Sequence, residues 1–447
     1  MTFASLAAGP YGAKMLGDPS GAVATAIIEG RITPPAGAYS DDPRHPVFLR
    51  AQNIEEGYLR FDDAKRLRPE VFAADPKSIL NDGDIVLTID GVRLGIAAVY
   101  REGDWPSCVS NHMVRIQHGD QIRPDFLACF LNSPLGQLQI KRGITGSAIP
   151  GLRADAIARI VVPTPPESVQ VRLVAALESA REASLRRLEA ADQLLAGLET
   201  YVLEKMELIV PPSDNRQVWA IRFYEDVIQR VDTTFHYPRL REVQQRVREI
   251  GGVQLGTLCT FSTERINPRE WGSSAFPYIE IGMVNAETGE ASAVVIPRED
   301  APSRARMLVR PGDVIVALTR PHRGSIAMIE DSLGVCVAST GFAVLRVNPD
   351  RVNASYLWAF LRTQPALLQM VQRSSGGNYP AITEQELAKI LVPVPPMAVQ
   401  DAVVEEAARR RSEAARLRTA AARNWDESKR RFDEELLTIR TNEENRP

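Results

Sequence analysis

The phrase "IVVPTPPESVQ" (residues 160–170) returns as "ILVPVPPMAVQ" (residues 390–400), 230 positions later in the chain. Each copy stands directly before a long stretch rich in alanine, leucine and arginine. Self-similarity at a fixed offset is typical of a duplicated architecture, so it constrains the fold more strongly than any single motif. The sequence therefore predicts two similar halves, each followed by a long helix.

The repetition covers most of each half. Three further pairs of segments align: 81–99 with 310–328, 125–133 with 355–363, and 146–152 with 376–382. The first of these pairs matches Gly83 with Gly312 and Asp84 with Asp313. Because the offset changes by only one residue, from 229 to 230, we expect both halves to share one architecture.

Local patterns predict that each half is α+β. "GDIV" leaves a turn and enters a β-branched run, and "GIAAVY" follows it after a glycine-containing loop, which favours a hairpin. Residues 123–143 carry apolar side chains at helical spacing and end near a glycine, so we expect one helix there. The proline-rich phrase reads as a short edge strand, since proline cannot donate a hydrogen bond to a neighbouring strand.

The two long stretches predict a helix pair. Apolar side chains recur in heptad register in both stretches, although Arg181 and Ser184 interrupt the first. The expected seam residues are Val174, Leu177, Leu188, Ala191, Leu195, Leu198 and Val202 in the first stretch, and Val404, Ala407, Ala414, Ala421, Trp425 and Phe432 in the second. An apolar stripe of this length must be buried, so we expect the two helices to pack antiparallel and to relate the halves by a pseudo-two-fold axis.

Composition excludes several classes of protein. The 447 residues are 44% hydrophobic and 24% charged, which suits a soluble chain with two or three domains. The four cysteines are far apart and predict neither a zinc site nor disulfides. The N-terminus lacks the pattern of a signal peptide and no window is apolar enough to span a membrane, so we expect a cytoplasmic protein. The net charge of −3 permits a local basic face but no uniformly basic surface.

Enzyme motifs are missing. No glycine-rich cofactor turn follows a strand, no NPPY-like loop is present, and no Gly-Lys dipeptide could begin a phosphate-binding loop. "DESK" (residues 426–429) has the residue types of a nuclease site but lies within a predicted helix, where neighbouring side chains diverge. The five histidines show no spacing that suits a metal. We therefore expect no catalytic residue and no metal in this chain.

Two equal halves joined by a helix pair suit a duplex that carries two half-sites. A duplicated scaffold that binds two copies of a protein fits the same geometry, and this alternative stays open. Arginine-rich loops favour DNA: "TRPHRG" (319–324) and the glycine-rich segments 141–151 and 372–381 combine cationic side chains with flexible backbone. Taken singly, each of these arginines is better explained as solvated surface.

The ordered series resembles a known family. "GPYG", "PVFLRAQNI", "GDIVL", "SCVSNHMVRI", "GSAIPGL" and "IVVPTPP" precede a long helix, and a second round follows. This order resembles the specificity subunits of type I restriction-modification systems. The resemblance implies two target recognition domains at residues 1–165 and 207–396, spacer helices at 166–206 and 397–438, and a tail at 439–447. A recognition subunit of another DNA modification or cleavage defence system is an alternative that the sequence does not separate.

The resemblance implies that each domain reads half of a bipartite DNA site while the helices dock two methyltransferase subunits, with nuclease-translocase subunits as further partners. It implies no cofactor here and S-adenosylmethionine in the methyltransferase. The expected DNA-binding residues are Arg50, Gln52, Asn53, Arg93, Lys141, Arg142, Ser147, Arg265, Arg320, His322, Arg323, Arg373, Asn378 and Tyr379. The expected partner-binding residues are Arg181, Arg186, Arg187, Arg409 and Arg410.

Overall fold

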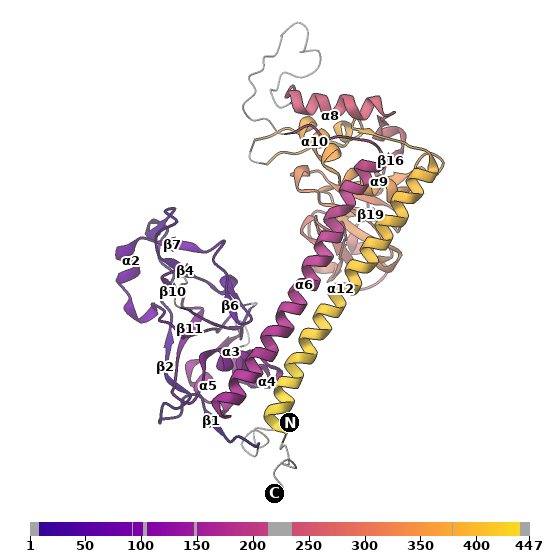
Figure 1. The fold of residues 1–447 in the computed structure, drawn as a ribbon. Helices are drawn as coiled ribbons and strands as arrows, with labels where there is room; N and C mark the ends of the chain where they lie inside the picture. The colour runs from indigo at the N-terminus through magenta and orange to yellow at the C-terminus, as the bar shows by residue number, and fades with distance from the viewer. Residues whose placement is uncertain are drawn as a thin grey trace. The chain divides into compact units, whose positions relative to one another are not determined.

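The computed structural model describes residues 9–91, 93–101, 105–146, 150–212, 235–377 and 379–438. The chain forms two compact units, the first drawn from residues 1–186 and 420–447 and the second from residues 187–419. Two long helices, α6 (Glu167–Lys205) and α12 (Met397–Leu437), contribute a segment to each unit (Figure 1).

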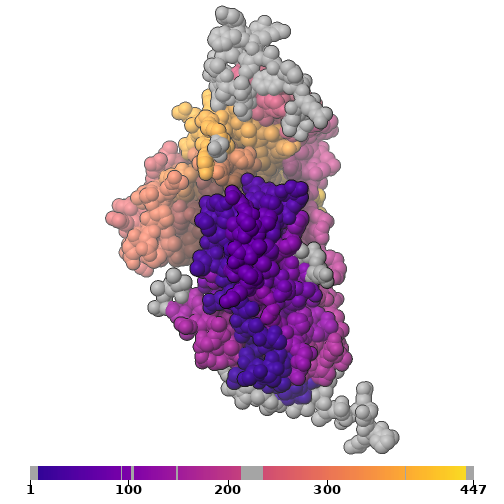
Figure 2. Space-filling model, turned by 90° about the vertical axis from the view of Figure 1, so that its left-hand side faces the viewer, coloured from indigo at the N-terminus to yellow at the C-terminus, as the bar shows by residue number. Residues whose placement is uncertain are grey.

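The first unit contains two four-stranded sheets, ordered β10-β4-β7-β3 and β2-β11-β8-β9. Its strands are β1 (Ala13–Met15), β2 (Ala24–Glu29), β3 (Tyr39–Ser40), β4 (Val47–Leu49), β5 (Ile54–Glu55), β6 (Tyr58–Leu59), β7 (Lys65–Leu67), β8 (Ile85–Thr88), β9 (Ala97–Val99), β10 (Ser107–Val109), β11 (Met113–His118), β12 (Ile144–Thr145), β13 (Gly151–Leu152) and β14 (Val161–Pro163). Its shorter helices are α2 (Pro69–Ala73), α3 (Pro124–Asn132), α4 (Pro134–Gly143) and α5 (Ala154–Ala158). Figure 2 shows the indigo and violet residues of this unit as a continuous packed surface.

The second unit also contains two four-stranded sheets, ordered β16-β23-β20-β21 and β18-β17-β22-β19. Its strands are β15 (Val253–Gln254), β16 (Cys259–Phe261), β17 (Ala275–Ile279), β18 (Val294–Pro297), β19 (Ala305–Val309), β20 (Val314–Ala317), β21 (Ile326–Met328), β22 (Cys336–Ser339), β23 (Phe342–Val347) and β24 (Leu391–Val392). Its shorter helices are α8 (Pro238–Glu249), α9 (Ala354–Leu361), α10 (Gln364–Arg373) and α11 (Glu384–Leu387).

The two units share the topology of one sheet and part of the other. Strand order β2-β11-β8-β9 in the first corresponds to β16-β23-β20-β21 in the second. Each second sheet contains one parallel pair, β4 with β10 and β17 with β22. Each proline-rich phrase forms a short strand paired antiparallel with an early strand of its unit, β14 with β1 and β24 with β15. The predicted short strands are therefore confirmed.

The glycine–aspartate turn before the central strand has the same geometry in both units. Gly83 and Gly312 have positive φ angles of 79° and 87°, which glycine adopts without a steric penalty. The carboxylate of Asp84 accepts a hydrogen bond from the Asn81 amide at 2.6 Å, and that of Asp313 accepts one from the Arg310 amide at 2.9 Å. The turn leads into antiparallel β8–β9 and β20–β21, so the predicted hairpin is confirmed.

Two buried glutamines repeat at the same offset. Gln139 donates to the Val161 carbonyl at 3.0 Å and accepts from the Val161 amide at 2.8 Å. Gln369 makes the same pair of bonds with Leu391, at 2.9 and 2.7 Å. Each glutamine thus replaces a missing strand neighbour for the short proline-ended strand, which satisfies backbone groups that burial would otherwise leave unpaired.

The single helix predicted for residues 123–143 is wrong. The structure divides it into α3 and α4, and Ser133 between them has an extended backbone (φ −72°, ψ 161°). The cause is Pro134, because proline disfavours helical geometry in the residue before it and is well tolerated at the first position of a new helix. Ser133 then caps α4 by accepting from the Gly136 amide.

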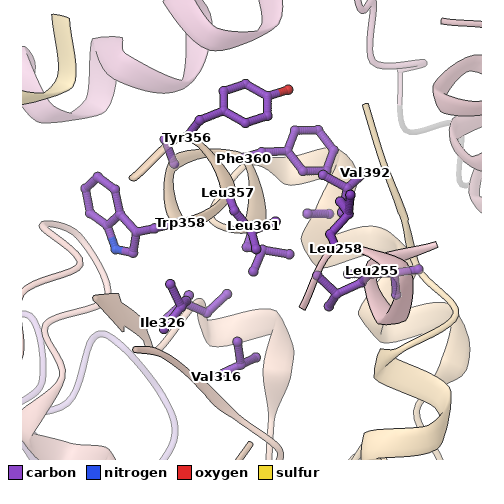
Figure 3. Close-up of a cluster of buried hydrophobic side chains, with 14 of the residues drawn as sticks. Leu255, Leu258, Val316, Ile326, Tyr356, Leu357, Trp358, Phe360, Leu361 and Val392 are labelled. Atoms are coloured by element: carbon purple, nitrogen blue, oxygen red, sulfur yellow. The ribbon is translucent and has the colours of Figure 1, made fainter. Parts of the chain in front are cut away.

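Helix α9 is the centre of the core of the second unit. Tyr356, Leu357, Phe360 and Leu361 are fully buried, and Figure 3 shows these side chains among residues of β20, β21 and β24. The same cluster includes residues of both long helices that belong to this unit, Val202 and Val403 among them. In the first unit, Val174 and Leu177 of α6 and Phe432 of α12 join the corresponding cluster. Each unit therefore buries the long-helix segments as part of its own core.

The helices run antiparallel in each unit. In the first, Arg172 pairs with Glu435, and the Ser184 hydroxyl donates to the Ala421 carbonyl at 3.1 Å. In the second, Arg418 pairs with Asp192 at 2.8 Å. The predicted fold class, α+β with two tandem domains and two long antiparallel helices, is confirmed.

The predicted seam of α6 needs one correction. Leu188 is 38% exposed, whereas Ser184 is buried. Ser184 continues the heptad series of Leu177, Ala191 and Leu198, and its hydroxyl is satisfied by the Ala421 carbonyl of the neighbouring helix. A small polar residue is thus tolerated within the seam because it finds an acceptor across it.

Candidate DNA interface

The loop that joins β20 to β21 is the most distinctive basic segment of the second unit. Arg320 has a left-handed backbone (φ 49°, ψ 53°) and leads into a 3-10 turn, Pro321–Arg323, which Gly324 closes with a φ of 69°. The Arg320 amide donates to the Pro380 carbonyl at 2.7 Å, and Thr319 forms a bridge with Ala381. Backbone bonds to residues 380–381 therefore fix the loop.

The side chains of this loop form a cationic group at the surface, in which Arg320 is half-buried. The Arg320 guanidinium lies 4.2 Å from the centre of the Tyr379 ring, and Tyr379 is 74% exposed. His322 and Arg323 are also exposed. An arginine that is stacked on an aromatic ring keeps its donor fork oriented, and arginine forks match guanine edges and phosphate oxygens. Four of the predicted residues are thus gathered here, while predicted Asn378 lies outside the described residues.

The equivalent loop of the first unit is arranged differently. The backbone of Asp90 forms an isolated β-bridge with Gly151, as that of Thr319 does with Ala381. The Asp90 carboxylate contacts Nδ1 of His112 at 2.8 Å. The Arg93 guanidinium pairs with Glu55. Predicted Lys141 and Arg142 lie exposed in the last turn of α4, and predicted Ser147 lies outside the described residues.

Segment 50–53 is partly structural. Gln52 is exposed and donates to Asp63 at 3.0 Å, and Arg50 is half-buried. Asn53 is fully buried, and hydrogen bonds satisfy its side chain. The side-chain amide donates to Asp63 at 2.9 Å, and the side-chain carbonyl accepts from the Arg50 backbone amide at 3.0 Å. Burial removes Asn53 from the side chains that can reach a base, so its expected contact needs correction to a supporting role.

Two further predicted residues of the second unit differ in availability. Arg373 forms an ion pair with Glu386 at 3.0 Å, and its side chain is only 10% exposed, which makes it a structural residue rather than a free DNA ligand. Arg265 is exposed. It borders an open depression together with Arg269 and Arg306, two arginines that the sequence prediction missed. The phrase "ERINPR" (residues 264–269) contains both Arg265 and Arg269, so two basic residues close together were the available signal.

The helix arginines are unequal. Arg186 and Arg409 are strongly exposed, at 68% and 61% of their side chains, and pair with acids on their own helices. Arg410 is 17% exposed and donates to the Leu194 carbonyl of α6 at 3.3 Å, so it belongs to the helix packing rather than to a docking surface. Arg187 is half-buried.

Arg181, the remaining predicted docking residue, is half-buried in the first unit. Its guanidinium stacks 4.1 Å from the centre of the Tyr58 ring. It lines a cavity of about 240 Å³ that Glu56 and Trp425 also border, and the Trp425 indole donates to Glu56 at 3.0 Å. This environment indicates a packing role, because the charge is held against the aromatic ring.

Among the described residues, no group of three or more histidine, cysteine, aspartate or glutamate side chains could hold a metal ion. Among the same residues, no helix is long and apolar enough to cross a membrane.

Comparison with known proteins supports the resemblance. Residues 248–405 match the type I restriction modification DNA specificity domain. The HindI specificity subunit of Haemophilus influenzae, a type I restriction enzyme subunit, is 24% identical over 109 residues, which are 24% of this chain and 24% of that protein. The match thus spans about a quarter of the relative.

A chain from a type I restriction-modification system, solved to describe complex assembly and conformational transition, has a similar fold. It aligns with a TM-score of 0.51 and 18% identity over 95% of this chain and 96% of its own length. The resemblance predicted from the sequence is therefore confirmed: the chain is similar to specificity subunits of type I restriction-modification systems, and residues 248–405 match their DNA specificity domain.

Proposed function

We propose that this chain is the DNA sequence-specificity subunit of a type I restriction-modification system. Each sheet-rich domain, at residues 1–165 and 207–396, reads one half of a bipartite DNA site. The long helices, at 166–206 and 397–438, set the spacer and dock two methyltransferase subunits, with nuclease-translocase subunits as further partners. The chain itself is non-catalytic, works in the cytoplasm, and leaves S-adenosylmethionine to its methyltransferase partner.

The group of Arg320 and Tyr379 carries this proposal. A non-glycine residue with positive φ costs about 1 kcal/mol or more, and such strain concentrates at functional sites. Within the described chain, Arg320 and Glu207 are the non-glycine residues with positive φ. The strained backbone places a cationic fork on an aromatic ring that is itself 74% exposed, an arrangement that packing within the unit does not require.

The sharpest test separates DNA reading from folding. Arg320→Gly relieves the left-handed strain, so the variant should be as stable as the parent or up to about 1 kcal/mol more stable. The same change removes the guanidinium from the proposed half-site. We expect the assembled complex to lose selectivity in one half of its methylated motif and to keep the other half, as read by sequencing methylated sites on random DNA.

Charge reversal supplies the matched control. Arg323→Glu should weaken the same half-site, whereas Arg351→Glu, an exposed arginine elsewhere in this unit, should leave the motif unchanged. The proposed reading loop would be contradicted if either variant lost selectivity in the other half of the motif. It would also be contradicted if Arg320→Gly and Arg323→Glu both left the motif unchanged. Assembly of the unvaried chain with methyltransferase but without any DNA preference would favour the protein-binding scaffold.

A further inference from the structure

An open depression of about 570 Å³ in the second unit is lined by Arg265, Asn267, Arg269 and Arg306. Ile266 and Ala301 complete the described lining, which contains no carboxylate. Arg265 and Arg269 are exposed and Arg306 is half-buried. Three arginines therefore line one open space.

The backbone that carries these arginines is well fixed. The Ile266 amide donates to the Arg306 carbonyl at 2.9 Å, which joins the segment to β19. Asn267 caps the 3-10 turn Pro268–Glu270 by accepting from the Arg269 amide at 3.3 Å. Arg298 donates to the Trp271 carbonyl at 2.9 Å and so holds the end of this turn. The arrangement is built into the fold rather than carried on a loose loop.

Among the residues that the structure describes, the three arginines differ from their neighbours in having no acidic partner. Arg310 and Arg346 share Glu264, and the pair of guanidinium groups lowers the pKa of that carboxyl to about 2. Among the described residues, no ion pair forms between a carboxylate and Arg265, Arg269 or Arg306. Like charges that share a depression repel one another, so an anion bound between them would be favoured.

The depression and the Arg320 loop flank one turn. Thr340 and Gly341 join β22 to β23; the Thr340 amide donates to the Arg304 carbonyl at 2.8 Å, next to β19. The Gly341 carbonyl accepts from the Leu318 amide at 2.8 Å, just before the Arg320 loop. Two consecutive residues thus bond to the chain next to each basic segment.

We propose that this arginine depression binds a phosphodiester group of the DNA backbone beside the half-site that the Arg320 loop reads. The proposal rests on the proposed function and deepens it, because it separates a positioning contact from a reading contact. Arginine pairs with phosphate through parallel N–H donors, and phosphate contacts set the register of a protein on DNA without reading its sequence.

The depression is a property of the second unit. The phrase "GRITPP" (residues 30–35) of the first unit aligns with "ERINPR" (residues 264–269) of the second, so Pro35 stands where the second unit has Arg269. Arg31, which aligns with Arg265, instead donates to the Val71 carbonyl at 2.8 Å. The two units should therefore depend differently on the backbone beside their half-sites.

The test pairs Arg269→Gln with single methylphosphonate substitutions, which neutralise one phosphate at a time in a duplex that carries the bipartite site. With the full chain assembled with methyltransferase, we expect Arg269→Gln to weaken binding about fivefold to tenfold and to lower the slope of log Kd against log salt by about 1. One methylphosphonate position should weaken the parent but weaken Arg269→Gln little further. Arg351→Gln is the matched control and should bind like the parent.

The outcomes are distinguishable. The phosphate site is overturned if Arg269→Gln and the double variant Arg265→Gln/Arg269→Gln both bind DNA normally with unchanged salt slopes. That result leaves the proposed function intact. A changed base preference with an unchanged salt slope overturns it in favour of base reading. Binding of inorganic phosphate by the parent, together with normal DNA binding by both variants, overturns it in favour of a free anion. Failure of the unvaried complex to bind DNA overturns the proposed function and this inference together.

Discussion

The carboxylate of Asp433, on α12, accepts a hydrogen bond from the backbone amide of Leu135 at 2.8 Å and so caps the first turn of α4. The second unit repeats this relationship with the other long helix, because Glu199 of α6 accepts from the Gln364 amide at 2.5 Å at the start of α10. An acid near a helix N-terminus satisfies free amides and interacts favourably with the helix dipole. In each unit, a shorter helix is thus capped by an acid of one of the two long helices.

Asp433→Asn should change the pH dependence of stability. Burial raises the pKa of Asp433 to about 6. Below pH about 4 the carboxyl is protonated in both the folded and the unfolded chain. Between pH about 4 and 6 only the unfolded chain loses the proton. The free energy of unfolding therefore falls as pH rises through this range, by about 3 kcal/mol in all. Asparagine still accepts from Leu135 but cannot ionise. We expect the variant to gain about that much stability relative to the parent between pH 4 and 7.5, measured by urea unfolding.

The control for this prediction is Asp426→Asn, which changes an exposed acid on the same helix. Its stability should stay within about 0.5 kcal/mol of the parent, because substitutions at exposed surface positions usually change stability little. Parallel pH profiles for the parent and Asp433→Asn would show that the buried carboxyl does not control this dependence.

The repeat made the fold predictable, because duplicated turns constrain each other. Gly83 and Gly312 indicated the same turn in both halves, to which the structure adds the positive φ angles, and the proline-rich phrases located two short strands. The break at Pro134 was missed because apolar spacing continues across it. Ser184 was misjudged because its hydroxyl depends on an acceptor in α12, more than 200 residues away, which local sequence does not reveal.

The candidate site was predicted less completely. Residue type correctly predicted that the Arg320 loop is basic and that His322 and Arg323 are exposed. It could not distinguish these residues from Asn53 and Arg373, because their availability depends on Asp63 and Glu386, partners that folding supplies. Distant contacts likewise determine which helix arginines remain exposed.

Gln369→Ala should destabilise the second unit by about 2 kcal/mol. The change removes two hydrogen bonds to Leu391 and leaves a buried amide and a buried carbonyl unpaired, at about 1 to 3 kcal/mol for each unsatisfied group after partial relaxation. Thermal unfolding of the full chain should show a lower midpoint for one transition. Gln139→Ala should produce the same loss through Val161 of the first unit, whereas exposed Gln364→Ala should change stability little.

Substitution of Arg409 and of Arg410 should change stability to different extents, although both residues pair with Glu406. Arg410→Ala should cost about 1 to 2 kcal/mol, because it removes a charged donor from the Leu194 carbonyl in the helix packing. Arg409→Ala should change stability by less than about 0.5 kcal/mol, since exposed ion pairs contribute little. If Arg409 docks a partner, that variant should instead weaken methyltransferase assembly in a pull-down. A stability loss with Arg409→Ala as large as with Arg410→Ala would contradict this division.

Shortening both long helices should shorten the DNA spacer if the helix pair sets it. Deleting residues 187–193 of α6 together with 413–419 of α12 removes one heptad from each helix, which keeps the seam in register and removes both members of the Asp192–Arg418 pair. The lost length is about 10 Å, so we expect the two halves of the methylated motif to be separated by about one to three fewer base pairs. A variant of full length, with exposed residues of the same segments replaced by alanine, should keep the original spacer. An unchanged spacer in the deletion variant would reject the helices as the element that sets it, because both half-sites would still be read while the helices had become shorter.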